Sequence, residues 1–539
     1  MSAPDPAAAA PEAPGPSTPP SRRAGLLRSS AVFSAMTLLS RLAGFARDML
    51  QGTLFGTGGA MSAFIVAYRI PNFLRRIFAE GSMAMAFVPV LNEIKQRGDK
   101  AELRRFIDRM AGALFAVVLV VCGLGMLAAP LIAQLFAPGW AGQPELLAQT
   151  ADLLRITFPY LLCISMMSLA SSVLNSHGQF GLPAFTPVLH NLTMIAAMLW
   201  LAPRFEVPPE GLAWGVVVAG VLQLLLLWPA LAKLGLLPRL RPSFRDPEVR
   251  KVGRLMLPTL FSSSVAQVNL IVGTAFASVL ASGSVDWLYY SDRLIEFPLG
   301  LFGVALGTVI LPHLSRRFAA GDGEGYSQSL DWGLRMALLA GVPAGLGLLL
   351  LAEPITATVY NYGEFTAVDT RMAAISLGAM SLGVPAFMLS KVLAPAFYAR
   401  QDTRTPMRAA IWTVAANVAL TVAITTPLWL RGVPGAHGGI ALATALAGIV
   451  NAWMLWRSLR RSGLYRPEAG WVRFALRLGA ACAAMAAVVL GARGWVGEWT
   501  AIAGPAARVG WLAAAIGAGA ASYALALVAL GLRPRHLRH

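Results

Sequence analysis

Long apolar runs decide which class of fold this chain can adopt. Residues 111–137, for example, form one continuous stretch rich in Leu, Ala and Gly. A bilayer-spanning helix needs about 20 apolar residues, whereas the strands of a membrane barrel alternate over segments of about ten residues. Only 13% of the chain is charged, against roughly 25% in an average soluble domain. We therefore predict an all-α polytopic membrane protein.

Polar or Pro/Gly-rich joints divide the apolar sequence into fourteen stretches, which predicts about 14 transmembrane helices. With an even number of spans, both termini lie on the same side of the membrane. The expected spans are 30–52, 60–94, 110–137, 151–174, 183–203, 210–232, 255–281, 285–314, 328–352, 371–398, 406–430, 438–456, 474–492 and 509–531.

Basic residues gather on one side of this predicted topology. The termini and the even-numbered joints carry 30 Lys and Arg residues, and the opposite joints carry 6. Cytoplasmic loops carry such an excess, so we place both termini in the cytoplasm, with residues 1–29 as a disordered cytoplasmic N-terminus. The net charge of +18 does not indicate nucleic-acid binding, because the cations are spread over short segments without interleaved aromatic residues.

The sequence also contains an internal duplication. Residues 62–99 resemble residues 286–322, with Arg69 at the position of Arg293, and a second, separate match has nearly the same offset. Parallel repeats of this kind hold a central site between two lobes and work by alternating access. The expected units are an N-terminal lobe (30–232), a cytoplasmic linker (233–254), a C-terminal lobe (255–456) and two further helices within 474–531.

Charged residues inside the apolar spans form the candidate site. Each costs roughly 2.5–3.5 kcal/mol at a helix centre and would not persist facing lipid. The cations are Arg41, Arg47, Arg69, Arg75, Arg76 and Arg293, and the acids are Asp48, Glu80, Asp292 and Glu296. The excess of cations favours an anionic ligand, and guanidinium groups suit phosphate or carboxylate. Arg335 and Lys391 lie near expected cytoplasmic helix ends, where we expect them to snorkel.

Helical geometry predicts how the charges of the first span are grouped. Arg41 and Asp48 share one face, while Arg47 lies about 120° away, from where it can reach a different neighbour. On the eighth span, Arg293 and Glu296 either belong to the site or form a structural ion pair.

The second span has charges on two sides. Arg69, Arg76 and Glu80 share one face, and Arg75 points elsewhere. Arg76 and Glu80 are alternatively a structural ion pair. The only ionisable residue between 183 and 203 is His190, which we expect to be structural.

Four long motifs carry most of these residues. They are SRLAGFARD (40–48), RIPNFLRRIFAEGSMAMAFVPV (69–90), ASGSVDWLYYSDRLIEFPLGLFGVALGTVILP (281–312) and KVLAPAFYARQDTRTP (391–406). Together they resemble the MurJ (MviN) family of bacterial lipid II flippases, and the resemblance extends over about residues 30–531. The family belongs to the multidrug/oligosaccharidyl-lipid/polysaccharide exporter superfamily, whose members have two six-helix lobes. MurJ-like members carry two additional helices.

The resemblance implies a transporter rather than an enzyme. Its cargo would be undecaprenyl-pyrophosphate-linked GlcNAc-MurNAc-pentapeptide (lipid II), moved across the bacterial inner membrane to the periplasmic leaflet for cell-wall synthesis. The implied substrate-binding residues are Arg41, Arg47, Asp48, Arg75, Glu80 and Arg293, with Arg69, Arg76, Asp292 and Glu296 as secondary candidates. The implied partners are lipid II, membrane lipids and the peptidoglycan-synthesis machinery, without nucleic acid, metal or organic cofactor. Helices within 474–531 would line a groove for the lipid tail.

Two departures from the family bear on the driving force. Many relatives have an Asp where this chain has Ser62, and the span 255–281 contains no Asp or Glu that would support a sodium site. The sequence leaves open whether sodium, protons or the membrane potential drives transport. It also leaves two alternative functions: a flippase for another polyprenyl-linked glycan, and a polytopic membrane glycosyltransferase.

Overall fold

The computed structural model describes residues 20–75, 82–502 and 504–531, which form helices and no strand. The expected all-α class is therefore confirmed. The first half contains α1 (Pro20–Phe55), α2 (Gly59–Arg75), α3 (Ser82–Arg97), α4 (Lys100–Leu127), α5 (Ala129–Phe136), α6 (Pro144–Thr157), α7 (Pro159–Ser176), α8 (Gly181–Ala196) and α9 (Pro208–Lys233). The second contains α10 (Pro247–Val279), α11 (Ser284–Pro298), α12 (Val304–Ala319), α13 (Gly323–Leu350), α14 (Ala352–Tyr360), α15 (Ala367–Ser381), α16 (Val384–Tyr398), α17 (Arg404–Leu430), α18 (Gly438–Arg461), α19 (Trp471–Val496) and α20 (Pro505–Ala529).

Short polar residues begin several of these helices. The Asp99 carboxylate accepts a hydrogen bond from the backbone N–H of Ala101 and caps α4, at 2.7 Å. Asp246 caps α10 in the same way, and Thr366 and Asp369 form a reciprocal capping box at the start of α15. Such caps satisfy backbone donors that have no partner within the helix, so they fix where each apolar segment starts.

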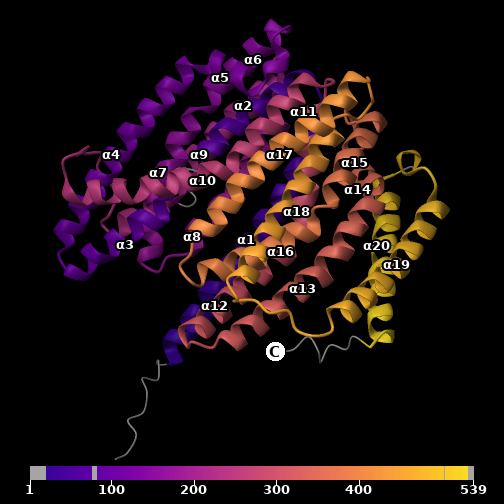
Figure 1. Ribbon diagram of the computed structural model, residues 1–539. Coiled ribbons are helices and arrows are strands. Elements are labelled where there is room, and N and C mark those ends of the chain that lie inside the picture. The colour runs from indigo at the N-terminus through magenta and orange to yellow at the C-terminus, as the bar shows by residue number, and fades with distance from the viewer. Residues whose placement is uncertain (1–19, 76–81, 503, 532–539) are drawn as a thin grey trace, which may run out of the picture.

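The helices pack in two bundles, seen as the indigo-to-magenta and the pink-to-orange parts of Figure 1. In the first bundle (α1–α9), α1 packs against α8, α2 against α6, and α7 against α9. In the second (α11–α18), α13 packs against α16, and α18 against α15 and α17. α10 contacts α3 of the first bundle and α17 of the second, and so joins them.

The number of membrane spans remains partly a prediction. Among the residues that the structure describes, nine helices are long and apolar enough to cross a membrane, or ten if the bent pair α15–α16 is one span. The expected count of 14 is therefore not confirmed. The expected stretches outside this set are 30–52, 60–94, 255–281 and 285–314. Three of these four carry the intramembrane charges of the candidate site, which lower their mean hydropathy.

The ends and breaks of the first and eighth stretches differ from expectation. α1 begins at Pro20, so residues 20–29, expected as part of a disordered terminus, are helical. The segment has Ala, Leu and Arg, which favour helix, directly before an apolar helix that it extends. The stretch 285–314 is broken by a π-helical turn, Leu299–Gly303, which directly follows Pro298.

The two bundles are joined by hydrogen bonds at the end of the molecule opposite both termini (Figure 1). Thr57, in the turn between α1 and α2, donates to Asp369 at 2.5 Å, and the backbone N–H of Gly58 donates to Asp286 at 2.9 Å. The Ser62 hydroxyl also donates to Asp286. Ser62 and Asp286 occupy equivalent positions in the two repeats, 224 residues apart. These bonds close this end between the bundles.

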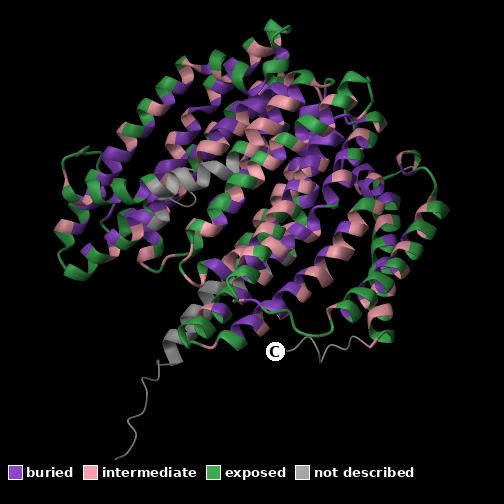
Figure 2. Cartoon of the chain, in the orientation of Figure 1, coloured by how far each residue is buried: buried purple, intermediate pink, exposed green. Residues whose placement is uncertain are grey.

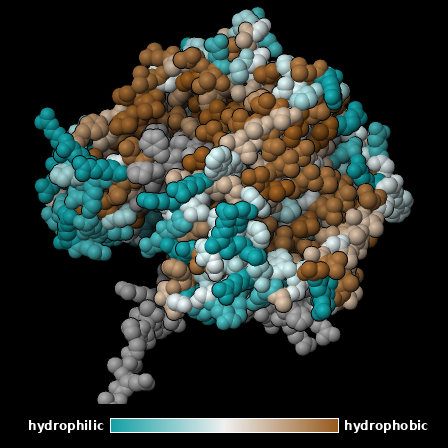
Figure 3. All heavy atoms as spheres, viewed as in Figure 1, coloured by the Kyte–Doolittle hydropathy of each residue, from teal (hydrophilic) through white to brown (hydrophobic). Residues whose placement is uncertain are grey.

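The outer surface suits a bilayer. Figure 3 shows a broad apolar band, with hydrophilic residues gathered at both ends of the molecule. α19 and α20 pack on each other and on α13 and α14 at the edge of the second bundle, and most of their residues in Figure 2 are exposed. The tail groove expected within 474–531 stays a prediction.

The linker 233–254 packs closely on α4. The Asp108 side chain accepts a hydrogen bond from the N–H of Arg239 at 2.7 Å, and its carbonyl accepts one from Arg241 at 3.3 Å. Gly112, one turn further along α4, faces the backbone of Arg241 and Pro242 so closely that a Cβ would collide with it.

Gly112→Ala should therefore destabilise the protein, because the linker must move away from α4, at a cost of about 1–3 kcal/mol. The thermal unfolding midpoint in detergent measures the effect. Gly123→Ala, on the same helix with open space around the added Cβ, is the matched control and should keep or raise the midpoint. Equal midpoints for the two variants would contradict the proposed close packing.

Candidate functional site

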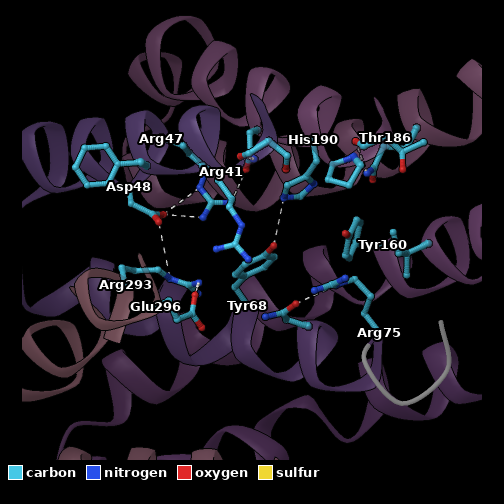
Figure 4. A pocket seen from close by; sticks show the side chains of 18 of the residues that line it. Arg41, Arg47, Asp48, Tyr68, Arg75, Tyr160, Thr186, His190, Arg293 and Glu296 are labelled. Carbon is cyan, nitrogen blue, oxygen red and sulfur yellow. Dashed lines mark hydrogen bonds and ion pairs between the residues drawn. The ribbon is translucent and has the colours of Figure 1, made fainter. Parts of the chain in front are cut away.

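A cavity of about 350 Å³ lies between the bundles, bounded by α1, α2, α7, α8, α9 and α11 (Figure 4). We call it the arginine cavity, because Arg41, Arg47, Arg75 and Arg293 all line it. The expected acid Asp48 also lines it, and so does Glu296. Residues from the first, second and eighth expected spans therefore meet in one place.

The Arg47 side chain is held in place by two partners. Its Nη2 donates to the Asp48 carboxylate at 2.6 Å, and its Nη1 donates to the Asn191 amide oxygen at 3.0 Å. Asn191 in turn donates to the carbonyl of Ser40, at 2.9 Å, so α8 is tied to α1. The side chains of Arg47 and Asp48 are only 12% and 7% exposed, so this ion pair is desolvated and well oriented.

Arg293 reaches the same carboxylate from the other bundle. Its Nε lies 3.8 Å from the second oxygen of Asp48, and its Nη1 donates to Glu296 at 3.0 Å. The guanidinium also lies over the ring of Tyr289, 4.9 Å from the centroid. Asp48 thus lies between two arginines, one from each repeat. The two alternatives left open for Arg293 and Glu296 do not exclude each other, because the residues form an ion pair and both line the cavity.

Arg41 differs from its neighbours. Among the described residues it forms no hydrogen bond and no ion pair, although it lines the cavity. It extends to the second bundle, where a Cβ on Gly300 would collide with its guanidinium. Gly300 lies in the π-helical turn Leu299–Gly303, a type of break that is frequent at functional sites.

The other end of the arginine cavity holds Arg75, which donates to Asn72 at 3.0 Å. Figure 4 shows Arg75 near Tyr160 at one end of the view, and Arg47, Asp48 and Arg293 at the other. Tyr68 and His190 lie between, with 3.3 Å from the Tyr68 hydroxyl to His190 Nε2.

A second cavity, of about 460 Å³, holds two secondary candidates that do not line the arginine cavity, and also Glu296, which lines both. Arg69 and Asp292 line it, and Arg69 also donates to the hydroxyl of Thr274 on α10. Its walls come mainly from α11, α16 and α18, with α2 of the first bundle on one side, so we call it the second-bundle cavity. The expectation that Arg75 points away from Arg69 agrees with their placement in two different cavities.

The structure gives Arg47 a second partner and places Lys391 differently from the expectation. Arg47 was expected to reach a different neighbour from the face of Arg41 and Asp48, and it does reach Asn191 of α8. Its guanidinium also binds Asp48, because a long side chain can fold back along its own helix. Lys391 was expected to snorkel at a helix end, but it lines the second-bundle cavity. Arg76 and Glu80 lie outside the described residues.

Several cavity residues escaped the sequence analysis. His190 and Asn191 both line the arginine cavity, although His190 was expected to be structural. Their signal was present, since two adjacent polar residues interrupt an otherwise apolar span. Tyr68 and Asn72 also line it, but a Tyr or Asn at a helix face does not by itself distinguish a cavity from a packed interface.

The arrangement suits an anion with several negative charges. Four arginines face two carboxylates, so the cavity retains an excess of positive charge, and Arg41 has its full set of donors available. In a desolvated cavity such donors bind phosphate groups more strongly than in water.

Comparison with known proteins agrees with this chemistry. The family model described as "Lipid II flippase MurJ" matches residues 52–507. The chain belongs to the MurJ family. A Vibrio cholerae serotype O1 protein named "Probable lipid II flippase MurJ" is 43% identical over 475 residues, which cover 86% of this chain and 89% of that protein. The Burkholderia cenocepacia protein named "Lipid II flippase MurJ" is 40% identical over 86% of this chain and 89% of that protein.

Solved structures extend the MurJ assignment to the fold. A structure titled "Lipid II flippase MurJ, inward closed conformation" has a TM-score of 0.76 at 25% identity and covers 92% of this chain and 98% of that one. An inward-facing multidrug resistance MATE family transporter has a TM-score of 0.65 at 14% identity, covering 80% of this chain and 98% of that one. The second likeness shows a shared fold alone.

Gly300→Ala should weaken binding of undecaprenyl pyrophosphate to this MurJ family member, because the added methyl group displaces Arg41. The guanidinium is the far end of a flexible side chain and can move aside, so only part of a charge-assisted contact worth about 1.5–3 kcal/mol is lost, and we expect Kd to rise by less than about tenfold. Gly307→Ala, whose added Cβ would make only ordinary contact at 3.6 Å, is the matched control. Wild-type affinity in Gly300→Ala would show that Arg41 need not occupy this position.

Proposed function

We propose that this chain is a lipid II flippase, which moves lipid II from the cytoplasmic to the periplasmic leaflet of the inner membrane. The observation that carries the proposal is the arginine cavity between two bundles, with Arg41 unpaired among the described residues. A pyrophosphate carries negative charge, which would balance the excess of positive charge in this cavity. Membership of the MurJ family supports the same cargo and makes the chain a transporter rather than an enzyme.

The proposed orientation places both termini in the cytoplasm. It is supported by the excess of basic residues, 30 against 6, in the termini and the joints on their side. In this orientation the hydrogen bonds of Thr57, Gly58 and Ser62 close the periplasmic end, and a ligand would enter the arginine cavity from the cytoplasmic side.

The charges suggest how binding is linked to the change of state. Asp48 neutralises Arg47 and approaches Arg293, so the empty cavity is partly compensated. An incoming pyrophosphate would supply charge to Arg41 first and then compete with Asp48 for Arg293, which belongs to the opposite bundle. Ligand binding would therefore draw the bundles together around the anion, because both contribute a guanidinium.

Replacing Arg41 or Arg47 with Ala should abolish transport while leaving the protein inserted, because Arg75 and Arg293 are held by other partners and do not replace the lost donors. Arg41→Lys should retain less than a tenth of the activity if the contact is bidentate. The measurement is the leaflet distribution of lipid II in cells depleted of the native protein and supplied with each variant at equal expression.

Arg431→Ala is the control for this experiment, because Arg431 is an exposed arginine just after α17 and lines neither cavity. It should support normal transport. Full transport by Arg41→Ala and Arg47→Ala would reject the proposed site. Accumulation of a different polyprenyl-linked glycan, with normal lipid II, would reject the proposed cargo.

We further propose that the membrane potential drives the cycle. An inside-negative potential favours the state in which unliganded arginines face the cytoplasm, by about 2.3 kcal/mol per charge per 100 mV. The bound pyrophosphate neutralises this charge and permits the outward turn, and its release allows the potential to reset the carrier.

Dissipating the potential at constant pH and sodium concentration should therefore stop lipid II from reaching the outer leaflet. Removing sodium or the proton gradient at constant potential is the control and should have little effect. Transport that persists without the potential, and fails only when one of the ions is removed, would assign the coupling to an ion.

A further inference from the structure

The second-bundle cavity differs from the arginine cavity in its chemistry but is joined to it. Tyr68, Asn72, Arg293 and Glu296 line both cavities, so they form a shared boundary. A ligand that extends past this boundary would occupy both cavities at once. Each has a volume typical of small-molecule sites, which range over about 300–1,000 Å³.

Charges in the second-bundle cavity are of both signs. Asp292 on α11 and Lys391 on α16 line it, and among the described residues neither forms an ion pair. The lining cations are Arg69, Arg293 and Lys391, and the acids are Asp292 and Glu296. The cavity is therefore closer to neutral than the arginine cavity. Lys391 has no acidic partner among the described residues, whereas Asp292 interacts electrostatically with Arg69 and Arg293 and would be shared between them and a ligand.

Neutral hydrogen-bonding groups line the same cavity. The Asn451 amide of α18 donates to Ser390 of α16 at 3.1 Å, and its oxygen lies 3.3 Å from the hydroxyl of Thr413 on α17, which donates its one hydrogen to the carbonyl of Ala409. An amide has two N–H donors and two acceptor lone pairs, so each side of Asn451 keeps a position for a further partner. The buried amide oxygen of Asn269, on α10, has no partner among the described residues.

These polar groups are not explained by helix packing alone. Polar side chains inside a bundle are costly unless they are paired, and those that line a cavity mark a path for substrate. The hydroxyls of Ser390 and Thr413 are already paired to carbonyls of their own helices, at 3.0 and 2.7 Å. The Asn451 and Asn269 amides, in contrast, can form further hydrogen bonds. Both line a cavity that also carries positive and negative side chains.

We infer that the second-bundle cavity binds the peptide of the lipid-linked precursor while the arginine cavity binds its pyrophosphate. The inference rests on the proposed function. A pentapeptide ends in a carboxylate, which Lys391 would bind, and an amino group of the peptide would pair with Asp292. Its backbone amides are donors and acceptors that match Asn451 and Asn269. A second pyrophosphate would instead place its charge beside Asp292 and Glu296.

The test compares three lipids: lipid II, the same lipid with its peptide removed, and undecaprenyl pyrophosphate. Their Kd values are measured with the purified full chain and with Lys391→Met. We expect Lys391→Met to bind lipid II about tenfold more weakly, as for loss of one charge-assisted hydrogen bond, and to bind the other two lipids as the wild type does. Arg47→Ala should weaken binding of all three.

Lys391→Arg is the matched control for folding and charge, and it should restore lipid II affinity. Three outcomes would overturn the inference: equal loss by Lys391→Met on all three lipids, loss on the peptide-free glycolipid as well as lipid II, and no loss on any. The second outcome would assign the cavity to the sugars. Wild-type protein that binds no pyrophosphate lipid more tightly than phosphatidylglycerol would instead reject the proposed function itself.

Discussion

Several arginines lie within apolar helices, and the structure around them has to offset the cost of keeping their positive charge there. The guanidinium groups of Arg47 and Arg293 are stabilised there because a carboxylate, an amide and an aromatic ring lie against them. Asp48 contacts Arg47 of its own bundle and Arg293 of the other, so the pairing that stabilises these charges is also a contact between the bundles. The side chains that we propose to bind the ligand are thus also side chains that join the bundles.

The sequence predicts the class of fold and most of the arginine cavity. Apolar runs identify helices regardless of their partners, and a charge in such a run is costly enough to indicate a site. Arg41, Arg47, Arg75 and Arg293 were found in this way. Arg47 could not be oriented from the sequence, since its contact with Asp48 depends on the side-chain conformation and on Asn191 of a distant helix.

The division into two cavities could not be predicted either. It depends on how α11 and α2 lie between the bundles, which is a property of tertiary packing. Residues such as Asn451, Ser390 and Thr413 are common in membrane helices. They indicate a binding site only because the fold brings them together at the second-bundle cavity. Lys391 was misplaced for a related reason: position near a helix end suggests snorkelling, but whether that end faces lipid or a cavity is decided by neighbouring helices.

The duplication brings two equivalent residues face to face at the closed end, where the Ser62 hydroxyl meets the Asp286 carboxylate. In a chain with Asp at both positions, two like charges would oppose each other, and the end would close only around a shared proton or a bound cation. A hydroxyl donates its own hydrogen and needs neither. One hydroxyl between equivalent positions of the two repeats therefore lets the bundles meet at this end without a proton shared by two carboxylates and without a bound cation.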